Sequence, residues 1–273
     1  MKVKDVMKKS PMTIGPNESL ALASQMMAWG GIRHLPVVED GKLVGILSER
    51  DILACEDRKH AHVSDVMSTP AHTASPDDTL VEAAGRMVAE GISALPIVEK
   101  GKLIGIVTST DVLAATVTES LEPTPPPQEG ITVGQVMTRE PLVAHPDDLV
   151  LDAAAKMQMR GVRHLPVVDG SGKLIGMLSD RDIRTAIGHP FASMDPESAR
   201  VRVQNLRVAD VMTKDVLTAR EDTKVTELAS AFADLAVGAV PVVDAEEKVV
   251  GICSYVDLLR ALSHPEALAS TGS

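Results

Sequence analysis

The chain has 273 residues and a formal net charge of −11, with 27 Lys and Arg against 38 Asp and Glu. This acidic balance argues against nonspecific binding to nucleic acid or to a membrane, because both depend on clustered Lys and Arg. The chain has no apolar run that could span a bilayer and starts without the apolar stretch of a signal peptide, so we expect a cytoplasmic protein. The two cysteines lie in non-equivalent places, which argues against a disulfide framework.

One block of about twenty residues occurs four times. It begins at Gly31, recurs at Gly91 and Gly161, and appears more loosely from Val237. A Val-Met pair ahead of each block and a proline inside it both recur at steps of 60, 70 and 75 residues. A unit of about 60 residues is marginally stable alone, so the copies are expected to pair.

Each copy predicts a short strand, a helix, two paired strands and a second helix. In the first copy, apolar residues at helical spacing over 19–29 follow a Pro-Asn-Glu-Ser start and end at a Gly-Gly pair. Two β-rich runs, 35–38 and 43–47, are joined by an Asp-Gly turn that is typical of hairpins. Ser48 is then expected to cap a helix that runs to about Ala54. The second and third copies repeat this pattern.

Some segments depart from the pattern. The turn at 244–248 in the fourth copy has no glycine, which predicts a longer and looser hairpin. Residues 122–130 are rich in proline and predict an extended spacer. Residues 189–207 contain several apolar residues and are expected to pack against the core or a partner, with a flexible loop as the alternative. The resulting division is repeats at 1–60, 61–119, 131–190 and 206–264, a linker at 120–130, a connector at 191–205 and a tail at 265–273.

The repeated pattern resembles the cystathionine-β-synthase (CBS) domain. It consists of Val-Met, a helix, Gly-Ile-x-x-Leu-Pro-Val-Val, Gly-Lys-Leu-x-Gly and Ser/Thr-x-x-Asp, in register through the copies. The resemblance implies an α/β (α+β) fold of four β-α-β-β-α repeats, paired into two Bateman modules. It also implies two clefts per pair that often hold adenosine nucleotides. No catalytic domain accompanies the repeats.

Polar residues of a ligand site are expected at the Ser/Thr-x-x-Asp motif. A carboxylate beside a hydroxyl suits the two hydroxyls of a ribose, because an anionic acceptor makes the stronger kind of hydrogen bond. The same spacing forms a helix N-terminal box, in which the helix dipole favours the acid. Both interpretations stay open, and one pair of residues can serve both purposes. The residues are Ser48 and Asp51, Thr108 and Asp111, Ser179 and Asp182, and Ser254 and Asp257.

The first and third copies carry basic side chains near this motif that the other copies lack. A phosphate prefers the forked guanidinium of Arg, so these copies are predicted to hold it. The alternatives are solvated or ion-paired arginines, and histidines that pack between helix and strand. The residues are Arg33, His34 and Arg50 in the first copy and Arg163, His164 and Arg181 in the third. In the second and fourth copies, Ser93-Ala94 and Ala239-Val240 are taken as the counterparts of the Arg-His pair.

An adenine would have to lie among aliphatic groups, because aromatic residues make up only 1% of the chain. The resemblance suggests the segment from Thr13 to Pro16, and its equivalent 73–76, for backbone contacts to the base. The third copy offers Val143-Ala144-His145-Pro146 instead, which differs from the other two.

The sequence lacks the phosphate loop, the His-Glu-x-x-His zinc motif and the nucleophile elbow, so we expect no enzyme. We expect a regulatory protein that binds AMP, ADP or ATP and signals to an unknown regulated protein, as a homodimer or as a disk within one chain. One alternative is a ligand-free scaffold. Another is a binder of S-adenosylmethionine or of a divalent metal.

Overall fold

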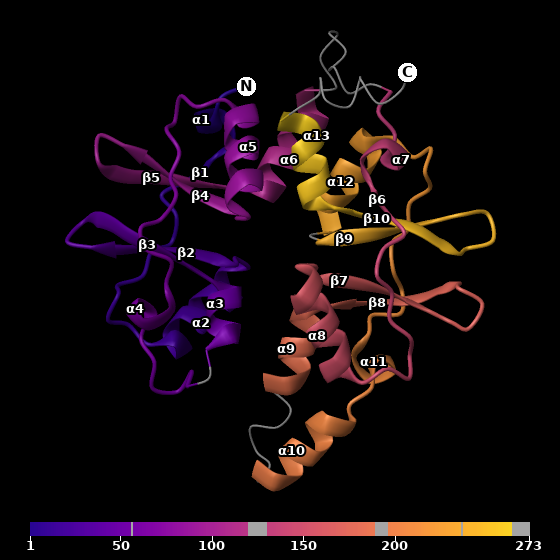
Figure 1. The fold of residues 1–273 in the computed structure, drawn as a ribbon. Helices are drawn as coiled ribbons and strands as arrows, with labels where there is room; N and C mark the ends of the chain where they lie inside the picture. Colours follow the sequence, from indigo (N-terminus) through magenta and orange to yellow (C-terminus); the bar gives the residue numbers. More distant parts are fainter. Residues whose placement is uncertain (56, 120–129, 189–195, 236, 264–273) are drawn as a thin grey trace. The chain divides into compact units, whose positions relative to one another are not determined.

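The computed structural model describes residues 1–55, 57–119, 130–188, 196–235 and 237–263, which fall into two compact units. The first unit holds the first and second copies, and the second unit holds the third and fourth (Figure 1). No helix among the described residues combines the length and the apolar character that a membrane span requires.

Both copies of the first unit show the predicted helix, two paired strands and second helix, but an unpredicted short helix comes first and the predicted short strand forms only in the first copy. The first copy contains α1 (Val3–Val6), β1 (Lys8–Lys9), α2 (Leu20–Gly30), β2 (His34–Glu39), β3 (Lys42–Ser48) and α3 (Glu49–Ala54). The second contains α4 (Val63–Val66), α5 (Leu80–Glu90), β4 (Ala94–Glu99), β5 (Lys102–Thr108) and α6 (Ser109–Glu119).

The second unit repeats this order. The third copy contains α7 (Val133–Val136), β6 (Thr138–Arg139), α8 (Val150–Arg160), β7 (His164–Val168), β8 (Leu174–Ser179) and α9 (Asp180–Gly188). The fourth contains α11 (Val208–Val211), α12 (Val225–Leu235), β9 (Ala239–Val243), β10 (Val249–Ser254) and α13 (Tyr255–Ser263), after an additional helix, α10 (Pro196–Asn205).

Local sequence signals set the ends of the long helices as predicted. The Ser19 hydroxyl accepts a hydrogen bond from the Leu22 amide at 3.2 Å and caps α2. The helix ends at Gly31, which has a φ of 58°. Glycine adopts this left-handed conformation at little cost, and Gly91 and Gly161 end α5 and α8 in the same way.

The hairpins confirm the predicted strands but vary in their turns. Asp40 and Gly41 have φ values of 49° and 74°, which fits a tight two-residue turn. The third copy departs from this expectation: the Asp169 side chain accepts from the amides of Ser171 and Lys173 and closes a longer turn. Asp244 closes the turn of the fourth copy in the same way, so that hairpin is longer, as predicted, but not loose.

Each unit packs its two hairpins side by side, with the long helices on the outside (Figure 1). In the first unit, β3 lies next to β5, α2 contacts β2, and α5 contacts β4. In the second unit, β7 lies next to β10. The strands β3, β5, β8 and β10 each lead directly into the predicted second helix of their copy.

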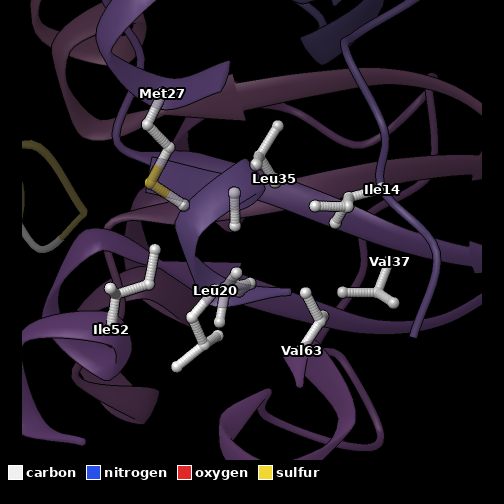
Figure 2. Packing of buried hydrophobic residues seen from close by; sticks show 9 residues of the cluster. Ile14, Leu20, Met27, Leu35, Val37, Ile52 and Val63 are labelled. Atoms are coloured by element: carbon white, nitrogen blue, oxygen red, sulfur yellow. The ribbon is translucent and has the colours of Figure 1, made fainter. Parts of the chain in front are cut away.

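The N-terminal segment of each copy docks on the other copy of its unit. The Val3 amide donates to the Asp78 carbonyl at 2.8 Å, and β1 pairs with β5. In return, the Val63 amide donates to the Glu18 carbonyl at 2.9 Å. Figure 2 shows Val63 inside the apolar core of the first copy. The repeats of the sequence and the packed bodies of the structure therefore do not coincide.

This exchange explains the Val-Met pair and the second glycine of Gly-Lys-Leu-x-Gly. A Cβ on Gly105 would lie 2.6 Å from Met7 Sδ, and a Cβ on Gly45 would lie 2.8 Å from Met67 Sδ. Methionine therefore fills the space that the absent side chain leaves on the partner hairpin. The same pairs, Met137 with Gly251 and Met212 with Gly176, occur in the second unit.

The predicted connectors are only partly described. Residues 120–129, 189–195 and 264–273 lie outside the described residues, so the linker and the tail are not tested. Within the 191–205 connector, α10 forms a helix that contacts α8. Leu206, which follows it, packs against the core of the third copy.

Candidate functional site

The Ser/Thr-x-x-Asp motif forms a capping box in the first three copies and the same bonds to the carboxylate in the fourth. Ser48 donates to Asp51 Oδ2 from its amide at 2.8 Å and from its hydroxyl at 2.7 Å. The Ser48 hydroxyl also accepts from the Asp51 amide at 3.3 Å. The two bonds to Oδ2 recur in Thr108 and Asp111, Ser179 and Asp182, and Ser254 and Asp257. The capping interpretation of the motif is therefore physically satisfied.

The box uses one carboxylate oxygen and leaves the other, Oδ1, outside it. A carboxylate has about four acceptor positions, so capping through Oδ2 does not prevent Oδ1 from accepting a ligand hydroxyl. The fourth copy differs, because Arg260 Nη1 lies 3.6 Å from Asp257 Oδ1. The geometry of the other three copies is compatible with both roles of the aspartate.

Backbone pairing brings the Arg-His pair to the same place as the box. His34 is paired with Ser48 in the β2–β3 register. The Glu49 amide, which starts α3, donates to the Arg33 carbonyl at 2.9 Å. The third copy repeats this pairing between His164 and Ser179, and the Asp180 amide donates to the Arg163 carbonyl at 2.9 Å.

The fourth copy requires a correction of register. Ala239 pairs with Ser254, as His34 pairs with Ser48, and the Tyr255 amide donates to the Gly238 carbonyl. The counterparts of Arg33 and His34 are therefore Gly238 and Ala239, not Ala239 and Val240. Val240 is a fully buried core residue.

The two histidines lie where the copies of a unit meet. His34 Nε2 lies 3.2 Å from the Ser93 hydroxyl of the second copy. A Cβ on Gly238 would lie 2.7 Å from His164 Nε2, so the ring occupies the space that this glycine leaves. Burial, followed by the nearby charges of Arg33 and Arg50, lowers the pKa of His34 to about 4.

The His164 pKa is also lowered, mainly by burial. Both imidazoles are then neutral at pH 7, which supports the packing alternative for the ligand-free protein. The positive charge near the box comes from the arginines. Arg33, Arg50 and Arg181 are exposed and Arg163 is half-buried.

The segment proposed for the base lies beside the first strand of each hairpin. The Ile14 amide donates to the Pro36 carbonyl at 3.1 Å, and the Val38 amide donates to the Ile14 carbonyl at 2.9 Å. The third copy keeps the same bridge between Ala144 and Val167 despite its different sequence. Thr13 is exposed, and no hydrogen bond between described residues joins it to the Ser48–Asp51 box.

The sequence did not indicate the roles of Ser93 and Gly238, which face the histidines from the second and fourth copies. Their spacing from Pro96 and Pro241 matches that of Arg33 from Pro36, and this equivalence was the available signal. Among the described residues, no group of three or more His, Cys, Asp or Glu side chains could hold a metal ion.

Comparison with known proteins identifies the repeats. The sequence pattern of the CBS domain matches residues 3–57, 63–117, 133–189 and 208–264. The uncharacterised protein MJ1225 of Methanocaldococcus jannaschii is 28% identical over 274 residues, which cover 92% of this chain and 95% of that protein. An inosine-5′-monophosphate dehydrogenase of Korarchaeum cryptofilum is 29% identical over 223 residues, which cover 81% of this chain and 42% of that enzyme.

Two solved structures share the fold over nearly the whole chain. The crystal structure of MJ1225, which has been suggested to be an archaeal homologue of γ-AMPK, superposes with a TM-score of 0.77 at 26% identity and covers 95% of this chain and 99% of that one. An uncharacterised conserved protein from Pyrococcus horikoshii gives a TM-score of 0.69 at 25% identity, with coverage of 96% and 100%. With four matched segments in two paired units, the chain belongs to the CBS domain family.

Proposed function

We propose that this protein is a regulatory adenine-nucleotide sensor, which binds AMP, ADP or ATP between paired CBS domains and signals occupancy to a partner protein. One observation carries the proposal: in the first and third copies, the backbone of an arginine lies beside the start of the helix whose box contains the aspartate. The suggested kinship of MJ1225 with γ-AMPK supports a regulatory role.

Each part of the ligand has a proposed partner. Asp51 and Asp182 would accept the ribose hydroxyls through Oδ1, because a charged acceptor strengthens those bonds. Arg33 and Arg163 would hold phosphate, with Arg50 and Arg181 adding positive charge. The base would lie near Thr13 and its equivalents. His34 and His164 would lie beside the phosphate, and Ser48 and Ser179 would lie beside the ribose.

The second and fourth copies would accept a different adenosine compound. Their boxes keep Asp111 and Asp257 as ribose acceptors, but at Asp257 a ribose would share Oδ1 with Arg260 Nη1, which lies 3.6 Å away. Ser93 and Gly238 stand where the other copies carry arginine, so a phosphate would lack its donor there. An adenosyl compound without phosphate, such as S-adenosylmethionine, fits these copies better.

A sensor must also transmit occupancy, and we propose that no reaction is catalysed. A ligand shifts the arrangement of the domains only if it binds one arrangement more tightly than the other. The ribose and phosphate partners lie next to the contact between copies, where His34 meets Ser93. Ligand binding can therefore change that contact, which a regulated protein could recognise.

Thermal unfolding with and without nucleotide tests the proposal. A ligand at about 100 times its dissociation constant stabilises the fold by roughly 2.7 kcal/mol. For a chain of this size, each kcal/mol raises Tm by about 2 to 4 °C. AMP, ADP or ATP should therefore raise Tm by several degrees. Arg33→Ala should reduce the AMP shift more than the adenosine shift, and Lys59→Ala, on the exposed connector, should change neither.

If no adenosine nucleotide at millimolar concentration changes Tm, the sensor proposal is wrong. The ligand-free scaffold would then be the better explanation of the paired domains.

A further inference from the structure

His34 occupies a position where one contact joins two CBS domains. Its ring is partly buried, and its Nε2 lies 3.2 Å from the Ser93 hydroxyl of the second copy. A hydroxyl can donate to a neutral imidazole nitrogen or accept from a protonated one. The contact with Ser93 can therefore persist whether or not the imidazole carries a charge.

The charges around the ring are unequal. The charged groups near it are Arg33, which precedes β2, and Arg50 and Asp51, on α3. The element of the second copy that packs against it contributes Ser93, which does not titrate. Burial, together with two positive charges that outweigh one negative charge near the imidazole, holds its pKa at about 4. In the empty site the ring is neutral at pH 7.

A phosphate placed beside Arg33 would reverse this balance. A phosphate monoester carries a charge of about −1.5 to −2 near pH 7, which exceeds the single positive charge in excess around His34. At a partly buried position this interaction is stronger than in bulk water. The added negative charge favours the imidazolium, whereas adenosine, which is neutral, adds no such charge.

We propose that the first CBS domain takes up a proton at His34 when it binds a phosphorylated adenosine, so that pH tunes its affinity for AMP but not for adenosine. This inference rests on the proposed function, because it requires phosphate to lie beside Arg33. His34 is then a positioning and charge-matching residue that recognises phosphate through its protonation state.

The third domain provides an internal comparison. His164 faces Gly238 instead of a hydroxyl, and its charged neighbours are Asp180, Asp182 and Arg163. The two carboxylates favour the protonated ring before any ligand arrives, and only one arginine opposes them. Burial nevertheless keeps the pKa of His164 lowered, so a phosphate beside Arg163 would favour the imidazolium there as well.

Isothermal titration of the full-length protein tests the proposal. AMP and adenosine are titrated into the wild type and His34→Gln, from pH 5.5 to 8, in buffers that differ in ionisation enthalpy. AMP binding should take up more protons in the wild type than in the variant. The ratio of wild-type to variant affinity for AMP should rise as pH falls, towards a limit of about tenfold per pH unit for one proton.

Two controls separate the histidine from other titrations. The second ionisation of the AMP phosphate, near pH 6, is common to both proteins and cancels in the ratio. The ratio of wild-type to variant affinity for adenosine should stay constant with pH. His60→Gln, a matched substitution at an exposed histidine on the connector, should behave like the wild type.

Equal proton uptake by the wild type and His34→Gln would overturn the inference, as would an adenosine ratio that follows the AMP ratio. If His34→Gln does not fold, Ser93→Ala serves instead: loss of the acceptor for the imidazolium should reduce proton uptake with AMP, and unchanged uptake would overturn the inference. If AMP binds but the wild type and His34→Gln take up equal numbers of protons, the proposed function remains intact. A wild type that binds neither compound refutes both.

Discussion

Asp51 uses one oxygen to cap a helix and leaves the other outside the box. If Oδ1 holds a ribose, Asp51→Asn should weaken AMP binding by about 1.5 to 3 kcal/mol, the range for a hydrogen bond to a charged group. The same change should cost the ligand-free protein only a few tenths to about 1 kcal/mol, the size of the helix-dipole effect. Isothermal titration and denaturant unfolding measure the two quantities.

Asp257→Asn is the matched control, because it removes the same carboxylate from the box of the fourth copy. That copy has Gly238 at the position that Arg33 occupies in the first copy, and Arg260 lies near Asp257 Oδ1. The stability cost should be similar to that of Asp51→Asn, with little loss of AMP affinity. Unchanged AMP affinity in Asp51→Asn and Asp182→Asn alike would assign both aspartates to capping alone.

His34 makes the stability of the ligand-free protein depend on pH. Its folded pKa of about 4 lies below the ordinary value of 6.5, so the unfolded chain binds the proton more tightly. Stability from this group is complete above pH 6.5 and is lost as pH falls towards 4, by up to about 3 kcal/mol. Urea unfolding between pH 4.5 and 7.5 should show a smaller pH slope in His34→Gln, and an equal slope would contradict the assignment.

At the residue scale, the sequence predicted local geometry better than contacts between copies. The Ser48–Asp51 box follows from a spacing of three residues, because the first turn of a helix brings residues at this spacing within hydrogen-bonding distance. The contact of His34 with Ser93 joins residues from different copies, and no local pattern predicts it. The register of the fourth copy was misplaced by one residue because the glycine that opens the block in the other copies, such as Gly91 in the second, is absent from the fourth.

At the scale of elements, the contact between a methionine and a glycine fixes each N-terminal segment on its partner hairpin. Gly105→Ala would place a Cβ 2.6 Å from Met7 Sδ and 3.1 Å from the Lys8 carbonyl oxygen. The side chain can move but the backbone of β1 cannot do so freely, so we expect a loss of about 1 to 3 kcal/mol in unfolding free energy.

Gly170→Ala is the control for that measurement. A Cβ on Gly170 would meet nothing within 4 Å, and the residue does not have a positive φ. Its unfolding free energy should stay within about 0.5 kcal/mol of the wild type. Equal losses in the two variants would show that helix docking through Met7 contributes little to stability.

The long helices and the hairpins were predictable because their signals span many residues. Apolar spacing, a capping Ser19 and a glycine after the last turn together define α2. The four-residue helix α1 and the two-residue strand β1 are too short to show a period, so their exchange between copies was missed. The helix α10 was also missed, because its polar sequence shows no apolar stripe.

At the scale of the whole molecule, exposed apolar side chains favour assembly. Trp29 and Met159 are 81% and 84% exposed, at the same position of α2 and α8. Large exposed apolar residues at matching places often belong to an interface. We therefore expect either a homodimer or a compact disk formed by the two modules of one chain.

Light scattering gives the mass and small-angle X-ray scattering gives the shape. A dimer mass, or a monomer mass with a compact profile, agrees with the expectation. A monomer whose two modules are splayed apart would contradict it.

The exchange of N-terminal segments has a consequence for biosynthesis. Lys8 pairs with Ile106, so β1 emerges from the ribosome about a hundred residues before its partner strand. At a synthesis rate of about 5 to 20 residues per second, the nascent first domain waits roughly 5 to 20 s with α1 and β1 undocked. Val63, which completes its core, also arrives after the helix and hairpin of that domain are made. The natural unit of cotranslational folding is therefore the pair of domains.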